Sequence, residues 1–138
     1  MSESAITFNG FTPYLHYADL PAAVAWLTRV CGFVEKGRWQ DETGALTNVE
    51  LLAGHAELWL DGAPGWWERR GRRPEEWIGV WVHDVDAMYQ RLIRSGVQVK
   101  APEYKFYGVR VVQVTDPEGY TWGFMQRAAY TARAPQQI

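Results

Sequence analysis

The chain has 138 residues, of which 47% are hydrophobic and 22% are charged, a balance that excludes low-complexity disorder and fits one globular domain. Its 14 Lys and Arg against 16 Asp and Glu give a net charge of −2, so nucleic acid and anionic membrane surfaces are not expected partners. No apolar run approaches the ~20 residues that span a bilayer, and the N-terminus lacks the features of a signal peptide. A single cysteine, Cys31, cannot form an internal disulfide. These observations predict a cytoplasmic protein.

In chain order, the sequence repeats one pattern. The segment FTPYLHYADLPAAVAWLTRVCG starts at Phe11, and EWIGVWVHDVDAMYQRLIRSG starts at Glu76. In each, a β-rich run leads into Asp19 or Asp84, whose short side chain is a good N-cap for the helix-period residues that follow. Each helical segment ends at a glycine, which readily adopts the positive φ of a helix C-terminus.

Three strand-like runs follow each helix, predicted at 33–40, 45–53 and 56–61 in the first half and at 97–100, 109–115 and 120–126 in the second. The sequence DPEG at 116–119 is typical of a β-turn. The segment 62–76, rich in Gly, Pro and charge, is predicted to connect the halves, and the tail after Ala129 to be loose. The order predicts an α+β fold of two βαβββ halves, at about 8–62 and 76–127. Each would be a four-stranded sheet with its helix on the outer face, leaving a cleft between the sheets.

Over residues 8–127 this pattern resembles the vicinal oxygen chelate superfamily, which includes glyoxalase I, extradiol dioxygenases and bleomycin-resistance proteins. The resemblance is carried by YLHYADLPAAVAWL, VWVHDVDAMYQRL and YGVRVVQVTDPEGYTWGF. It implies four positions for metal ligands, here Thr12, Trp59, Trp77 and Gly123. Trp and Gly offer no side-chain lone pair to a cation, and a Thr hydroxyl is a poor ligand. We therefore expect no metal and no other cofactor, as in the bleomycin-resistance branch, which also implies a homodimer with pockets at its interface.

The chain has eight tryptophans, more flat aromatic surface than a core of this size needs. Residues two apart on a strand share a face. The residues that alternate with Trp59 and Trp77 are therefore predicted to face the cleft with them. The opposite faces of these strands are predicted to pack on the helices, and they carry Leu58, Leu60, Ile78, Val80, Trp122 and Phe124. Trp39, Trp66 and Trp67 are expected at the mouth of the cleft, and Gly123 is expected to leave space in its wall. The predicted ligand-binding set is Thr12, Tyr14, His16, Trp39, Glu57, Trp59, Asp61, Trp66, Trp77, Trp81, Arg110, Gly123 and Met125.

A mostly aromatic pocket with a few polar groups is how small-molecule sites are commonly built, and Trp faces also attract cations. The leading interpretation is a metal-independent protein that binds and sequesters a planar or cationic small molecule. One alternative is a metal-free isomerase, lyase or cyclase, with His16, Glu57 or Tyr14 as acid or base, although the sequence places no carboxylate that must orient His16. A further alternative is an interaction domain whose interior is filled by its own tryptophans. Arg110 could reach an anionic ligand group or pair with Glu50.

Overall fold

The structure is a computed structural model that describes residues 5–71 and 76–128. Its elements are β1 (Tyr14–Tyr17), α1 (Leu20–Trp26), η1 (Leu27–Cys31), β2 (Val34–Gln40), β3 (Leu46–Ala53), β4 (Ala56–Gly62), α2 (Trp66–Arg70), β5 (Trp77–Trp81), α3 (Val85–Arg94), β6 (Glu103–Lys105), β7 (Val109–Thr115) and β8 (Thr121–Arg127). The tail after Ala129 lies outside the described residues. No helix in the described ranges is long and apolar enough to cross a membrane.

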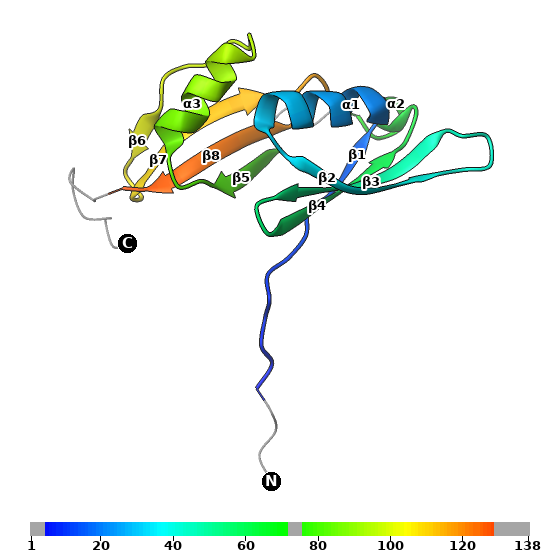
Figure 1. The fold of residues 1–138 in the computed structure, drawn as a ribbon, viewed down its shortest axis with the longest axis horizontal. Coiled ribbons are helices and arrows are strands. Elements are labelled where there is room, and N and C mark those ends of the chain that lie inside the picture. The colour runs from blue at the N-terminus through cyan, green and yellow to red at the C-terminus, as the bar shows by residue number, and fades with distance from the viewer. Residues whose placement is uncertain (1–4, 72–75, 129–138) are drawn as a thin grey trace.

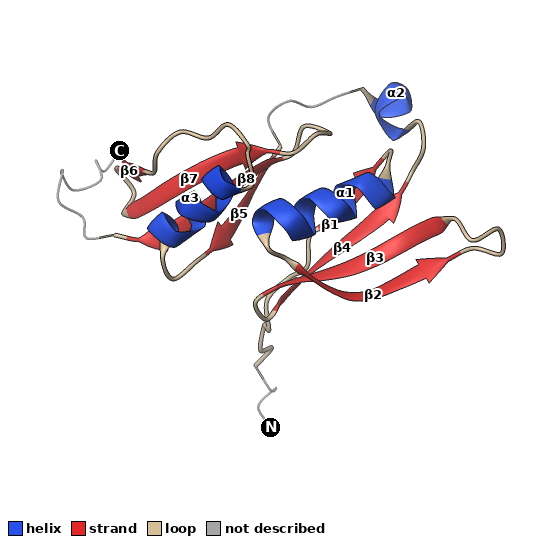
Figure 2. Cartoon of the chain, turned by 45° about the horizontal axis from the view of Figure 1, so that its top comes forward, coloured by secondary structure: helices blue, strands red, loops and turns tan. Residues whose placement is uncertain are grey.

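The strands form two four-stranded sheets with the same topology, β1-β4-β3-β2 and β5-β8-β7-β6. In each sheet the first and last strands of the half pair in parallel, and the other pairs are antiparallel. Figures 1 and 2 show α1 and α3 on the same side of the two sheets, which lie side by side. The predicted α+β fold with two βαβββ repeats is confirmed.

Both helices begin and end where the sequence predicts. Asp19 accepts a hydrogen bond from the backbone N–H of Ala22, and Asp84 accepts from those of Asp86 and Ala87, so each carboxylate caps a first turn. Gly32 follows η1 with a φ of 82°, and Gly96 follows α3 with a φ of 89°, which non-glycine residues rarely adopt. The C-terminal part of the first helical segment is the π-helical turn η1, which the sequence did not indicate.

Two predictions about irregular segments are wrong. Residues 97–100 form no strand, and the edge strand is β6, directly after Pro102. Because proline has no N–H to donate to the ladder, pairing with β7 starts one residue later. The predicted connection 62–76 also contains the short helix α2. Its Trp67 is 5% exposed and belongs to the core, whereas the sequence placed this side chain at the mouth of the cleft.

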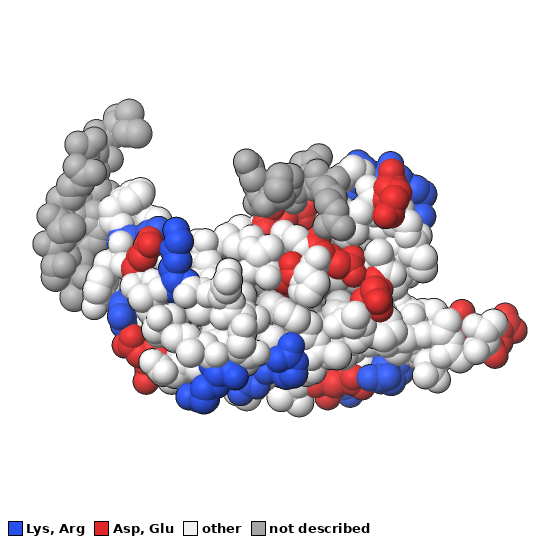
Figure 3. Space-filling view, turned by 90° about the horizontal axis from the view of Figure 1, so that it is seen from above, with Lys and Arg blue, Asp and Glu red and all other residues white. Residues whose placement is uncertain are grey.

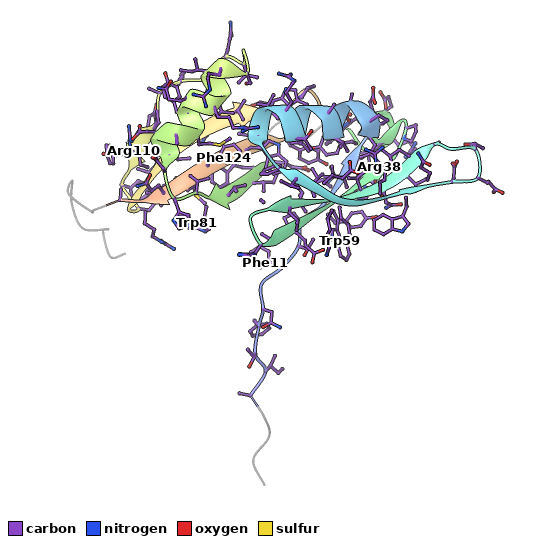
Figure 4. The ribbon with its side chains drawn as sticks, viewed as in Figure 1. Phe11, Arg38, Trp59, Trp81, Arg110 and Phe124 are labelled. Atoms are coloured by element: carbon purple, nitrogen blue, oxygen red, sulfur yellow. The ribbon has the colours of Figure 1, made fainter. Side chains whose placement is uncertain are left out.

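The core lies between the helices and the faces of the sheets that they cover. Leu58, Leu60, Trp122 and Phe124 are at most 4% exposed, which confirms the phase predicted for them. Figure 4 shows Phe124 on the helix side of its sheet. Figure 3 shows small charged groups, several of them with basic and acidic side chains next to each other, separated by uncharged surface.

The turn between β7 and β8 holds the two halves together. Buried Asp116 accepts hydrogen bonds from the Tyr17 hydroxyl of the first half (2.6 Å) and from the Trp122 indole (3.1 Å). Glu118 accepts from the backbone N–H groups of Ala18 and Asp19, at 2.7 and 2.9 Å. Burial raises the pKa of Asp116, although its hydrogen-bond donors oppose that shift. The carboxylates of this turn therefore fix β1 and the start of α1 against the second half.

Candidate functional site

The faces of the two sheets opposite the helices carry the predicted aromatic residues. Tyr14, Trp59, Trp77 and Trp81 are 49%, 39%, 42% and 52% exposed, respectively, although all four belong to regular strands. Figure 4 shows Trp59 and Trp81 projecting on this side, from different sheets. We call these two surfaces together the aromatic face. In a single chain the aromatic face is open to solvent, so its tryptophans do not form a filled interior.

On the first sheet, Asp61 joins two neighbouring side chains of β1. Its Oδ1 atom lies 2.6 Å from Nδ1 of His16, and its Oδ2 atom accepts a hydrogen bond of 3.2 Å from the Tyr14 hydroxyl. The parallel register of β1 and β4 places His16 directly beside Asp61. Burial and the nearby Asp61 carboxylate raise the pKa of Tyr14. The structure thus supplies the orienting carboxylate for His16 that the sequence did not place.

A second carboxylate on this sheet lies beside Trp59. Glu57 accepts a hydrogen bond of 3.1 Å from the Trp59 indole N–H and pairs with Lys36, also at 3.1 Å. The hydrogen bonds from Trp59 and Lys36 hold the pKa of Glu57 below its ordinary value, so this group stays charged at neutral pH. The Tyr14 and Trp59 rings are in edge contact, with their centroids 6.4 Å apart. The first sheet therefore combines an indole, a phenol and two carboxylates.

The second sheet has a different surface. Gly79 and Gly123 pair across β5 and β8, and the indole of Trp77 lies over both of them. A Cβ atom added to Gly79 would be 2.8 Å from the Trp77 ring, and one added to Gly123 would overlap that ring. The space predicted at Gly123 is thus already filled by a side chain of the same chain. The two glycines let the indole lie flat on the sheet.

Trp81 already has a cationic partner. The Arg127 guanidinium carbon lies 4.2 Å from the centroid of the Trp81 ring, a cation–π contact. Together with Val82, His83 and Gln126, these two residues line a hollow of about 560 Å³ at the end of the sheet. One face of Trp81 is therefore occupied by the chain itself, whereas Trp59 has a carboxylate beside it.

The other predicted site residues are spread over several parts of the structure. Thr12 precedes β1 in an extended segment and is exposed, because Pro13 separates it from the strand. Arg110 points to the helix side and pairs with Asp86 of α3 at 2.6 Å, and not with Glu50 (Figure 4). Trp39 is 51% exposed on the edge strand β2. Trp66 contacts His16, with ring centroids 4.3 Å apart. Met125 pairs with Trp81 across β5 and β8.

The remaining chemistry-bearing residues are separate from this face. Cys31 is buried, and burial raises the pKa of its thiol to about 12, which suits a packed side chain and not a nucleophile. Within residues 5–71 and 76–128, no group of three or more His, Cys, Asp or Glu side chains is arranged to hold a metal ion. The polar groups that do converge, those of His16, Asp61 and Tyr14, are suited to hydrogen bonding and proton transfer.

The sequence profile of the glyoxalase/bleomycin resistance protein/dioxygenase superfamily matches residues 13–124. The chain belongs to this superfamily. The match spans both βαβββ repeats and confirms the resemblance to the vicinal oxygen chelate proteins. A search of curated proteins finds no significant match.

Solved structures of this superfamily have the same fold. TioX from Micromonospora sp. ML1 is 26% identical with a TM-score of 0.69, and the alignment covers 87% of this chain and 99% of TioX. A bleomycin-binding protein complexed with bleomycin is 21% identical with a TM-score of 0.67, covering 87% and 99% of the two chains. The bleomycin-binding protein of Streptomyces verticillus, complexed with copper(II)-bleomycin, is 19% identical with a TM-score of 0.65, covering 91% and 99%. Bleomycin-binding proteins are therefore among the proteins similar to this chain.

The sequence identified most of these residues but missed how they combine. Strand alternation predicts that the side chains of His16 and Asp61 both point to the cleft, and this is the signal that they lie on one face. Whether they touch depended on the register of β1 against β4, a long-range pairing that no local pattern fixes. The contact of Trp66 with His16 depended on α2, which the sequence did not predict.

Proposed function

We propose that this protein binds and sequesters a planar aromatic or cationic small molecule on its aromatic face, without a metal ion. The observation that carries the proposal is the exposure of Trp59, Trp77 and Trp81 on regular strands, with the Glu57 carboxylate beside Trp59. Large exposed apolar patches on soluble domains usually mark interaction sites. Indole faces bind planar rings and attract cations, and Glu57 adds negative charge next to Trp59.

We infer that a second copy of the chain covers part of this face in a homodimer. The extended segment before β1 leaves the body on the side opposite the helices (Figure 1), and its Ile6, Phe8 and Phe11 are 80%, 86% and 93% exposed. Such side chains gain stability when they are removed from water, by about 25 cal/mol for each Å² of apolar area buried. A partner chain would bury them and close the open face into a pocket.

Trp59→Ala tests the binding site. We expect it to weaken binding by about 1–3 kcal/mol, since it removes a central aromatic contact while the core stays intact. The measurement is a titration of intrinsic tryptophan fluorescence in chelator, with metal-free bleomycin and a panel of planar and cationic compounds. The control is Trp26→Phe, because Trp26 packs against the core from α1 and not on the aromatic face.

The outcomes separate the parts of the proposal. Saturable quenching that Trp59→Ala weakens and Trp26→Phe does not supports a site on the aromatic face. Equal affinity in Trp59→Ala and the unaltered protein would place the site elsewhere. Sedimentation equilibrium of the full chain, and of a variant with Ile6, Phe8 and Phe11 changed to Ser, tests the homodimer. We expect the variant to dimerise more weakly, and a monomeric unaltered protein would contradict the inference.

A further inference from the structure

The strongest feature that sequestration does not use is the imidazole of His16. Its Nδ1 atom is 2.6 Å from Asp61 Oδ1, short for a contact between nitrogen and oxygen. A carboxylate only accepts hydrogen bonds, so it favours the form of the ring in which Nδ1 carries a proton. Nε2 then holds the free lone pair of the neutral ring. Within the described part of the chain, Nε2 makes no hydrogen bond.

The surroundings hold this imidazole in one orientation. The Tyr14 hydroxyl donates to the other Asp61 oxygen at 3.2 Å, and Asn48 in turn approaches that hydroxyl at 3.4 Å. The ring of Trp66 lies against the imidazole, with centroids 4.3 Å apart. The side chains of His16 and Asp61 are 31% and 23% exposed, so the pair is partly sheltered but accessible. A base that is oriented by a carboxylate and open to a bound molecule is the arrangement that general base catalysis requires.

His16 also lines a cavity of about 310 Å³ at the junction of the two halves. The cavity is formed by Tyr14, His16, Trp66, Arg70, Glu76 and Tyr120. The guanidinium carbon of Arg70 lies 5.6 Å from the centroid of the same Trp66 ring that contacts His16. A base and a cation therefore lie against one indole. The contact of Arg70 with the Glu76 carboxylate is long, at 3.5 Å, which favours a further interaction of its charge with a ligand.

We propose that His16 is the general base of a metal-free catalytic site at this junction, acting on a planar carbonyl compound in which a C–H group lies between the carbonyl group and a C=C double bond. Nε2 takes the proton from that carbon, and the electron pair of the broken C–H bond moves onto the carbonyl to give an enolate. The Arg70 guanidinium faces the negative oxygen. Return of the proton from the imidazolium to the far carbon of the conjugated enolate restores the carbonyl group and moves the C=C double bond next to it, an isomerisation that needs no oxidant or other co-reactant. Asp61 is a positioning residue, which fixes the orientation and the tautomer of the ring.

This step needs only a positioned base, so it can be tested with a simple planar probe. In nitrobenzisoxazole, removal of one C–H proton breaks the N–O bond and releases a coloured cyanonitrophenolate, with no other reactant. The protein should accelerate this elimination in chelator, and His16→Gln should lower the catalysed rate by about tenfold or more. The control is His55→Gln, because His55 lies in the β3–β4 turn outside the cavity. Equal rates in His16→Gln and the unaltered protein would overturn the proposal.

Asp61→Asn separates a positioning role from a merely structural one. We expect it to slow the elimination by about tenfold in protein that melts normally, and the double variant with His16→Gln should be no slower than His16→Gln alone. Nitrogen NMR of the imidazole should show the Nδ1–H form in the unaltered protein and a mixture of forms in Asp61→Asn. Additive rate effects, or the same mixture in both proteins, would contradict the role of Asp61. Neither result depends on whether the aromatic face binds bleomycin.

Discussion

The two halves of the chain share one fold, yet matched positions carry different chemistry. Tyr14 and Gly79 each lie five residues before the aspartate that caps their helix. In the first sheet Tyr14 pairs with Trp59, whereas in the second sheet Gly79 pairs with Gly123. Two large aromatic residues are thus replaced by two glycines, and the indole of Trp77 covers the glycine pair.

The next matched pair of positions also differs between the sheets. His16 lies beside Asp61 in the first sheet, and Trp81 lies beside Met125 in the second. The first half therefore presents groups that exchange protons and attract cations, and the second half presents flat apolar surface. A repeated fold fixes where side chains are placed, but the residue at each position decides what the surface can do.

The halves also differ in the roles of their turns, and the largest expected effect tests this difference. Asp116→Asn should lower the free energy of unfolding by about 2–4 kcal/mol. The Tyr17 hydroxyl and the Trp122 indole both donate to Oδ2 of Asp116, so an asparagine NH₂ group at that position would leave two buried donors without an acceptor. Denaturant unfolding measures the change. The matched variant is Asp41→Asn in the β2–β3 turn, whose exposed carboxylate binds Thr43, Gly44 and Ala45 of its own turn. A similar loss in both variants would contradict a special role for Asp116 at the junction.

Gly123→Ala tests how closely Trp77 lies on the second sheet. The added methyl group overlaps the indole, so the ring must move, and we expect a loss of about 1–3 kcal/mol in unfolding free energy with a shift in tryptophan emission. In the first half, Gly37→Ala is the matched control, since its added Cβ would meet the Trp39 ring at an ordinary 3.5 Å. If Gly123→Ala changed neither stability nor emission, the indole would not rest on the glycine pair.

The smallest expected effect concerns the charge of the first half. Glu57→Gln should weaken binding of a cationic compound a few fold at low salt and leave a neutral planar compound unaffected, because the carboxylate is exposed and screened. The pKa of Glu57 is lowered, so its contribution to cation binding is complete above the ordinary pKa of 4.5. That contribution is lost only as the pH falls through the depressed pKa. Titrations at several pH values measure this. A loss of cation binding well above pH 4.5 in the unaltered protein would assign the effect to another group.

The sequence by itself determined the repeat, the helix caps and the faces of the strands. These features depend on local chemistry: Asp19 and Asp84 satisfy nearby N–H groups, Gly32 and Gly96 allow a positive φ, and strand alternation separates Trp59 from Leu58 and Leu60. It also showed that the four ligand positions implied by the resemblance hold side chains that are unsuited to a metal ion.

Only the tertiary structure decided which of these side chains touch. The contact of His16 with Asp61 depends on the register of two strands more than 40 residues apart in sequence, and the contact of Trp77 with Gly123 depends on the register of β5 and β8. From the sequence, Arg110 could reach an anionic ligand group or Glu50, whereas packing of α3 on β7 places Asp86 beside it. Long-range pairing and helix packing are cooperative properties of the whole chain, so the acid–base pair and the glycine-supported indole became visible only in the folded protein.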